Sequence, residues 1–403
     1  MKITDVSIYT VQRAGSDFGL GQFDDGPRGG APLEDGTVSA HPLSIFPEYK
    51  NVEIDHRTFG PAAYAPFVVE LHADNGVSGF AVNHGGGEIA ARLVRDQFSS
   101  FLVGQNPFDS NRIWEQMYRS QLATSQGGLA YMAISAIDLA LWDLKAKLLD
   151  KPVCELIGGR TKEALPCYVT TFPSVMEHMA GHGFAGVKIA SPWGVADGRR
   201  GLDRIEQMVV EAKDIFGGDT TLMIECFMSW DLDFATKAAR RLKRYGIDWI
   251  EDPLLADSST AKYREVRDSI RPTRLAVGNL MWGYNRFYSL ITEGAVDVIQ
   301  PELQWSGGLT EALRIAAIAR GRGIPIIAHT CGVYSYHFTM ANIDAPIAEY
   351  MAPGEGTEVR AKGHVIIGEP APKDGYIHLS DEPGFGIELE RSLLIPLQER
   401  SHD

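Results

Sequence analysis

Ionisable and amide side chains follow a series of short apolar segments in this 403-residue sequence. The segments have the length and composition of buried β-strands. Each carries, at or just after its end, a group that can bind a cation or move a proton: Lys188, Glu225, Glu251, Asn279, Glu302, His329 and Glu349. If these strands are parallel and close into a barrel, their carboxyl ends meet at one rim, where such barrels form their active sites. The sequence therefore predicts that these side chains share one site.

Three of the groups offer oxygen ligands on consecutive strands, namely Glu225, Glu251 and Asn279. Mg²⁺ prefers oxygen ligands and keeps some positions for water or substrate. A substrate carboxylate on the metal would place positive charge where charge develops when a proton leaves the neighbouring carbon. A lone carboxylate at a strand end could instead cap the next helix, but three oxygen ligands on adjacent strands favour a magnesium site. Asp252 should face the other way by strand alternation, which gives it a structural role.

His329 and Glu302 form the predicted catalytic pair. A carboxylate that binds one imidazole nitrogen fixes the tautomer and raises the basicity of the other nitrogen. A buried structural histidine is the alternative, but the strand-end position beside Glu302 favours catalysis. Lys188 is expected to bind a substrate carboxylate, or else to be an ordinary barrel lysine. Trp193, in the loop after the same strand, either lines the pocket or only packs the loop.

Eight β-rich segments alternate with helical patterns in the second part of the chain, which predicts a parallel (β/α) barrel. The expected strands are 166–171, 184–189, 220–225, 247–251, 274–278, 296–300, 324–328 and 347–351. The expected helices between them include 201–215, 233–245 and 309–322. The fold class is thus α/β, a modified TIM-type (β/α)7β barrel with an α+β N-terminal capping domain.

The N-terminal part begins with an expected strand at 2–12 and a hairpin, 66–73 with 77–83, around the turn signal Asp-Asn-Gly. Helical patterns at 88–103, 108–124 and from 129 onward follow the hairpin. Three parts are expected: a capping domain at 1–125 with a Gly- and Pro-rich lid loop at about 14–60, a barrel domain at 126–362, and a segment at 363–403 that returns to the capping domain.

Bulk composition excludes several classes of partner. A formal net charge of −14 argues against binding to nucleic acid, which needs clustered Lys and Arg. The four cysteines are widely spaced, which is typical of reduced thiols in a cytoplasmic protein and not of a disulfide framework. The N-terminus has no apolar segment of the kind found in signal peptides, and no run is long enough to span a membrane. A small anionic substrate remains compatible with the overall charge.

Six stretches resemble enzymes of the mandelate racemase branch of the enolase superfamily, and within it the L-rhamnonate dehydratases. The branch signature is similar to AIDLALWDLKAKLLDKPVCELIGG at 136–159. The dehydratases are similar over PWGVADGRRGL (192–202), LMIECFMSWDLDFATK (222–237), QPELQWSGGLTEALRIAAIA (300–319), AHTCGVYSYH (328–337) and the tail from 368 to 389. Together the stretches cover most of the chain, the N-terminal loop being the least alike.

The resemblance implies a Mg²⁺-dependent lyase that removes the proton beside a sugar-acid carboxylate and eliminates water. It implies metal ligands at Glu225, Glu251 and Asn279, the base at His329 and its partner at Glu302. A strand-8 carboxylate at Glu349 and a substrate contact from Arg57 in the capping domain complete the implied site. Enzymes of this superfamily use a Lys or His base together with Mg²⁺.

Three positions depart from the pattern of these relatives. Glu225 and Glu302 stand where Asp is usual, and Asn279 stands where Glu is usual. Asn279 keeps an oxygen ligand but removes one negative charge, which should weaken cation affinity. Only the first lysine of the Lys-x-Lys motif found in many superfamily members is present, as Lys188.

The first expected substrate is L-rhamnonate, followed by related acids such as L-lyxonate and L-mannonate. Two other classes stay open: a racemase or epimerase on the same fold, and a drifted homologue that binds acid sugars without turnover. The missing second lysine argues against the racemase, whereas Asn279 and the absence of the histidine that usually follows this ligand favour the drifted homologue. The resemblance also implies a homo-oligomer, from dimer to octamer.

Overall fold

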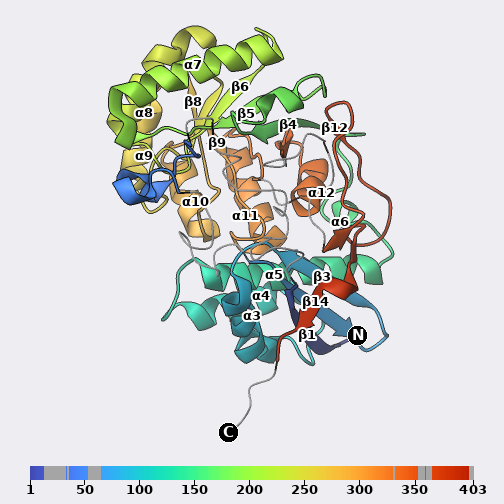
Figure 1. The fold of residues 1–403 in the computed structure, drawn as a ribbon. Helices are drawn as coiled ribbons and strands as arrows, with labels where there is room; N and C mark the ends of the chain where they lie inside the picture. Colours follow the sequence, from blue (N-terminus) through green and yellow to red (C-terminus); the bar gives the residue numbers. More distant parts are fainter. Residues whose placement is uncertain are drawn as a thin grey trace.

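The computed structural model describes residues 1–12, 33, 36–52, 65–329, 332–352, 359 and 365–398. Figure 1 shows two layers, with the N-terminal sheet and its helices below and the curled parallel sheet with its helices above. Arg57, Cys331 and most of the expected lid loop lie outside the described residues. Within the described part of the chain, no helix is both long and apolar enough to cross a membrane.

The lower layer is a four-stranded antiparallel sheet in the order β14-β1-β2-β3. Its strands are β1 (Ile3–Val11), β2 (Phe67–Ala73), β3 (Ser78–Asn83) and β14 (Leu394–Pro396). β2 and β3 form the expected hairpin, and Gly76 takes the positive φ of +86° that its turn needs. β14 pairs with β1 through Thr10 and Ile395, so the C-terminal segment completes this sheet.

Three helices connect the lower sheet to the barrel: α3 (Gly87–Asp96), α4 (Ser110–Gln121) and α5 (Leu129–Leu148). α5 is buried along most of its length because it packs against β3 on one side and α11 (Gly308–Gly321) on the other. Its buried carboxylates hold these neighbours. Asp138 accepts hydrogen bonds from the backbone and hydroxyl of Thr310 (2.9 and 2.6 Å), at the start of α11.

Asp143, one turn further along α5, joins three parts of the chain. It accepts hydrogen bonds from the backbone N–H of Phe80 in β3 (2.9 Å) and of Phe385 in the C-terminal segment (3.0 Å). It also pairs with Lys147 at 2.6 Å. The signature stretch at 136–159 therefore contributes structural side chains, which anchor the capping sheet and the tail to the helix below the barrel.

The upper layer is a parallel sheet in the order β10-β4-β5-β6-β7-β8-β9. Its strands are β4 (Leu165–Thr171), β5 (Val187–Ala190), β6 (Leu222–Glu225), β7 (Trp249–Glu251), β8 (Arg274–Val277), β9 (Val298–Ile299) and β10 (Ala348–Met351). The register aligns Ala190 with Glu225 and Glu225 with Glu251. Two carboxylates consequently end neighbouring strands at the same height, as the sequence predicts.

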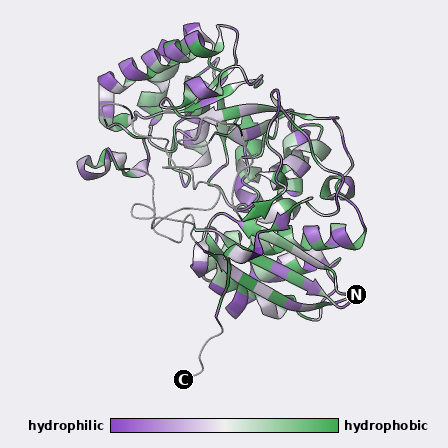
Figure 2. Ribbon diagram, turned by 45° about the vertical axis from the view of Figure 1, so that its right-hand side comes forward, coloured by the Kyte–Doolittle hydropathy of each residue, from purple (hydrophilic) through white to green (hydrophobic). Residues whose placement is uncertain are grey.

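Helices cover the outside of this sheet. They are α7 (Gly198–Phe216), α8 (Leu232–Leu242), α9 (Thr260–Ser269), α10 (Gly283–Thr292), α11 and α12 (Val333–Ala341). In α7 the buried side chains follow helical spacing, from Leu202 through Ile205 and Met208 to Ala212. Figure 2 shows hydrophilic residues along the outer side of the helices and hydrophobic residues toward the sheet.

Shorter elements complete the described chain. They are η2 (Pro42–Ile45), η3 (Pro47–Tyr49), η4 (Phe98–Phe101), α6 (Val153–Leu156), η5 (Met176–Met179), η6 (Val195–Asp197), η7 (Lys243–Tyr245), β11 (Ile366–Ile367), β12 (Tyr376–Ile377), β13 (Glu388–Leu389) and η8 (Arg391–Leu393). β12 pairs antiparallel with β4.

The expected strand at 324–328 is wrong as a regular strand. Only an isolated bridge between Ile299 and Ile326 forms there. Pro301 and Pro325 lie in the two facing segments, and neither has an N–H to donate to a ladder. The backbone still holds this segment beside β9, because the N–H of His329 donates to the carbonyl of Pro301 (3.1 Å).

Candidate active site at the barrel rim

The ends of β6 and β7 bring Glu225 and Glu251 together in a buried place. Glu225 is 8% exposed and Glu251 is fully buried. Burial, followed by the charge of Glu251, raises the pKa of Glu225 well above its ordinary value. Two buried carboxylates this close can both be ionised only if cations lie beside them, so the arrangement is that of a cation site.

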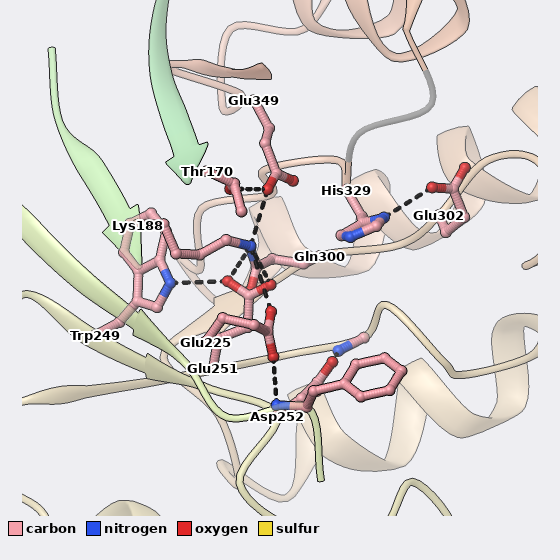
Figure 3. Close-up of polar contacts among 12 residues, drawn as sticks. Thr170, Lys188, Glu225, Trp249, Glu251, Asp252, Gln300, Glu302, His329 and Glu349 are labelled. Atoms are coloured by element: carbon pink, nitrogen blue, oxygen red, sulfur yellow. Dashed lines mark hydrogen bonds and ion pairs between the residues drawn. The ribbon is translucent and has the colours of Figure 1, made fainter. Parts of the chain in front are cut away.

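Lys188 is the first such cation. Its side chain is fully buried, and its Nζ lies 2.5 Å from Glu251, 2.9 Å from Glu349 and 3.5 Å from Glu225. Burial opposes its charge, but Glu251 and Glu349 outweigh burial and raise the pKa of Lys188 well above its ordinary value. Figure 3 shows the ammonium group between Glu349 and the other two carboxylates. Lys188 therefore stands inside the acidic cluster as a permanent positive charge.

Asn279 follows β8, on the strand next to Glu251. It is 5% exposed, and its Oδ1 has no hydrogen-bond partner in the described part of the chain. Gly278 precedes it with a φ of +138°, and a Cβ there would lie 3.0 Å from the backbone of Gln300. A side chain at position 278 would thus push the end of β8 away from the segment after β9.

The donor set fits a hard divalent cation. Two carboxylates and an unsatisfied buried amide oxygen on three consecutive strands are the oxygen ligands that Mg²⁺ prefers. Among the described residues, no three His, Cys, Asp or Glu side chains group closely enough to hold a metal. The amide oxygen of Asn279 would accordingly have to supply the third protein ligand, in place of a carboxylate.

His329 and Glu302 are joined by a hydrogen bond of 2.8 Å between Nδ1 and Oε2. The other oxygen of Glu302 accepts the backbone N–H of Gln304 (3.0 Å), which fixes the carboxylate in place. Burial disfavours a charged imidazole, but Glu349 and the bond from Glu302 outweigh it and raise the pKa of His329 above its ordinary value. The predicted pair is therefore present, and the carboxylate of Glu302 binds Nδ1 of His329.

Glu349 ends up on the Lys188 side of the site. It is fully buried on β10 and accepts a hydrogen bond from the hydroxyl of Thr170, across the parallel β10–β4 pairing. Burial would raise its pKa, but Lys188 and then His329 outweigh burial and lower the pKa of Glu349. Glu349 is hence ionised at neutral pH, and its charge contributes to the raised pKa of His329.

Trp193 lies in the loop after β5, and Asp252 directly follows Glu251. Trp193 is partly buried in the loop after β5, where its carbonyl accepts hydrogen bonds from Ser191 (2.8 Å) and from the indole of Trp230 (2.9 Å). Asp252 is buried with a φ of +41°, and its pKa is raised to about 7 by burial and by Glu251. Its Oδ1 lies 3.4 Å from the backbone N–H of Gly278.

Three neutral residues of the site carry no signal that singled them out in the sequence. Thr170, Trp249 and Gln300 all donate hydrogen bonds to the site carboxylates. Trp249 lies two residues before Glu251 and Thr170 two residues after Tyr168, so strand alternation alone directs each pair to one face. The inward positions of Trp249 and Thr170 could have been inferred, but the contacts of Thr170 and Gln300 depend on the register between strands.

The sequence matches two family profiles over most of its length. One is described as the mandelate racemase / muconate lactonizing enzyme N-terminal domain and matches residues 45–158. The other is described as the enolase C-terminal domain-like family and matches residues 174–393. The chain belongs to this enolase-type family, whose fold combines a capping domain with a curled parallel-sheet barrel.

Within the family, the chain is similar to proteins named for one activity. A Caldivirga maquilingensis protein provisionally named L-rhamnonate dehydratase is 34% identical, over 98% of this chain and 96% of its own. The crystal structure of rhamnonate dehydratase from Gibberella zeae complexed with Mg is 32% identical, with a TM-score of 0.88 over 98% of this chain and 96% of that one. The 3,6-anhydro-D-galactonate cycloisomerase from Zobellia galactanivorans, at 22% identity and a TM-score of 0.75 over 98% and 100% of the two chains, shares the fold.

Proposed function

We propose that this chain is a Mg²⁺-dependent dehydratase of aldonic acids, with L-rhamnonate as its first substrate. The observation that carries the proposal is the His329–Glu302 pair on the same rim as Glu225, Glu251 and Asn279. A base beside an oxygen-ligand site is what removal of a proton next to a carboxylate requires. The similarity to L-rhamnonate dehydratases over nearly the whole chain supports the choice of substrate.

In the proposed reaction, Nε2 of His329 takes the proton from carbon 2 of the sugar acid. Mg²⁺, when held by Glu225, Glu251 and Asn279, would supply positive charge beside the substrate carboxylate. The electron pair left on carbon 2 forms the double bond to carbon 3 as the 3-hydroxyl leaves, protonated by the imidazolium to give water. The resulting enol takes a proton at carbon 3 and becomes a 2-keto-3-deoxy acid.

Lys188 and Glu349 complete the proposed site. The buried ammonium of Lys188 offsets part of the charge of the three carboxylates around it. We assign it, with Trp193 and Arg57, to substrate binding, while Glu349 sustains the basicity of His329 through its charge. Arg57 would approach from the capping domain, as its similarity to the family implies.

The organisation of the protein extends this proposal. We propose a capping domain at 1–125 with its lid at about 14–60, a catalytic barrel at 126–362 and a returning segment at 363–403, consistent with the β14–β1 pairing. A cytoplasmic location and a homo-oligomer, from dimer to octamer, belong to the same proposal. The buried, unpaired thiols of Cys154, Cys167 and Cys226 support a reducing compartment.

A substrate screen tests the proposed activity. The purified protein with Mg²⁺ is incubated with aldonic and aldaric acids, L-rhamnonate, L-lyxonate and L-mannonate among them, and 2-keto-3-deoxy products are measured. Ketone formation confined to rhamnonate-like acids supports the proposal. Inversion at carbon 2 without a ketone would indicate an epimerase, and silence across the panel with both Mg²⁺ and Mn²⁺ would indicate a drifted acid-binding homologue.

A further inference from the structure

The carboxylate of Glu251 is held by donors from β5, from its own strand β7 and from the segment directly after β9. Its Oε2 accepts hydrogen bonds from the indole N–H of Trp249 and from the side-chain amide of Gln300, both at 2.9 Å. Its Oε1 accepts from Lys188 at 2.5 Å. The two neutral donors thus take one oxygen and leave the other for charged partners, an arrangement that Figure 3 shows around Lys188.

Trp249 can hold its donor in a fixed place. It is 2% exposed in the barrel interior, with a ring 5.5 Å from that of Tyr168 in an edge-to-face arrangement. Arg274 lies over the indole at 5.6 Å. An indole packed in this way has little rotational freedom, so its N–H has one direction, toward Glu251.

The hydrogen bond from Gln300 to Glu251 comes with an unsatisfied polar atom on Gln300 itself. Its side chain is fully buried, and its Oε1 has no hydrogen-bond partner among the described residues. A buried amide oxygen without a partner is unfavourable, and an apolar side chain at this position would avoid the cost. The amide nitrogen nonetheless points to Glu251. Unsatisfied polar groups of this kind collect where orientation of a functional group matters more than stability.

We propose that Trp249 and Gln300 are positioning residues for Glu251. By binding Oε2 they turn the carboxylate so that Oε1 faces Lys188 and the cation site, and as neutral groups they do so without competing for its charge. The inference rests on the proposed function, because it takes Glu251 as a magnesium ligand. Hydrogen-bond partners of metal ligands typically change metal affinity about 10- to 100-fold when they are removed.

The test compares Mg²⁺ binding to full-length Trp249→Phe and Gln300→Met with binding to the wild type. Each substitution removes one donor and keeps much of the volume. Trp114→Phe is the matched control, since Trp114 is also 2% exposed and its indole also donates one buried hydrogen bond, to the carbonyl of Gly307 (2.8 Å). Titration calorimetry with Mg²⁺ alone gives the affinity, and circular dichroism checks the fold.

We expect each of the two site variants to bind Mg²⁺ about tenfold more weakly than the wild type, and Trp114→Phe to bind within twofold of it.

Wild-type affinity in both Trp249→Phe and Gln300→Met would overturn the positioning role and leave the proposed function intact. Absence of Mg²⁺ binding by the wild type itself would overturn the magnesium site, and the inference with it. If one variant fails to fold, the other decides the question, because both act on the same oxygen.

Discussion

Nδ1 of His329 and Oε2 of Glu302 lie 2.8 Å apart, between the segment after β9 and the segment that replaces the seventh strand. Glu302 is itself fixed by the N–H of Gln304. A carboxylate held in this way accepts the proton of Nδ1, so Nε2 is the basic nitrogen. This hydrogen bond and the adjacent carboxylates of Glu225 and Glu251 are the basis of the catalysis and metal binding that we expect.

Removal of the base should abolish turnover without unfolding the protein. His329→Asn keeps a polar side chain of similar size but cannot take a proton, and we expect kcat on the best acid sugar to fall about a thousandfold or more. Mg²⁺ affinity should stay within a few-fold of the wild type. His178→Asn, at an exposed position, is the control. Retained activity in His329→Asn would disprove the base assignment.

The pH profile should depend on Glu302. Neutral His329 is the active form, and its pKa is raised, so kcat/KM should rise with pH through a limb above 6.5. Glu302→Gln can still accept from Nδ1 but lacks the charge that favours the imidazolium, so the limb should move to lower pH and kcat should fall. Exposed Glu265→Gln should leave the profile in place. If kcat/KM of Glu302→Gln rises at the same pH as that of the wild type, Glu302 does not set the pKa of His329.

Asn279 should limit metal affinity. Asn279→Asp is nearly isosteric and adds a carboxylate to the proposed ligands, so Mg²⁺ should bind about tenfold more tightly. Asn279→Ala removes the unsatisfied oxygen and should weaken binding by a similar factor. Calorimetry measures both, with exposed Asn111→Asp as a control for added surface charge. Equal affinities in all these variants would place the cation elsewhere.

Asp143 should be essential for stability and remote from the chemistry. Asp143→Ala leaves the buried N–H groups of Phe80 and Phe385 without partners, at a cost of about 3 kcal/mol in the free energy of unfolding. Asp233→Ala provides a matched control, because it breaks an exposed i,i+4 pair with Lys237 and should change stability little. Urea denaturation compares the two. Similar stabilities would contradict the role of Asp143 as the anchor of the capping sheet and tail.

The site could be predicted from the strand ends because neighbouring parallel strands of similar length end at the same edge of the sheet. Glu225 and Glu251 terminate apolar runs of similar length, and register then aligns them without further information. His329 and Glu302 follow the same rule even though 324–328 forms no regular strand, because the bridge at Ile326 and the hydrogen bond from the N–H of His329 to the carbonyl of Pro301 keep the segment in place.

Contacts across the barrel were beyond what the sequence could predict. Gln300 reaches Glu251 from the segment after β9, across β8, and its residue type is not conspicuous in a β-rich run. The three protein carboxylates around Lys188 were not predicted: its strand, β5, lies between β10, which carries Glu349, and the strands β6 and β7, which carry Glu225 and Glu251. Arg57 lies outside the described residues, so its contact with substrate stays a prediction.

Incubation with L-rhamnonate and Mg²⁺ in D₂O, followed by NMR, tests the central claim most directly. The account predicts loss of the carbon-2 proton signal and a 2-keto-3-deoxy product that carries deuterium at carbon 3, with neither change in His329→Asn. Deuterium at carbon 2 without a ketone, or a ketone formed equally well by His329→Asn, would contradict it.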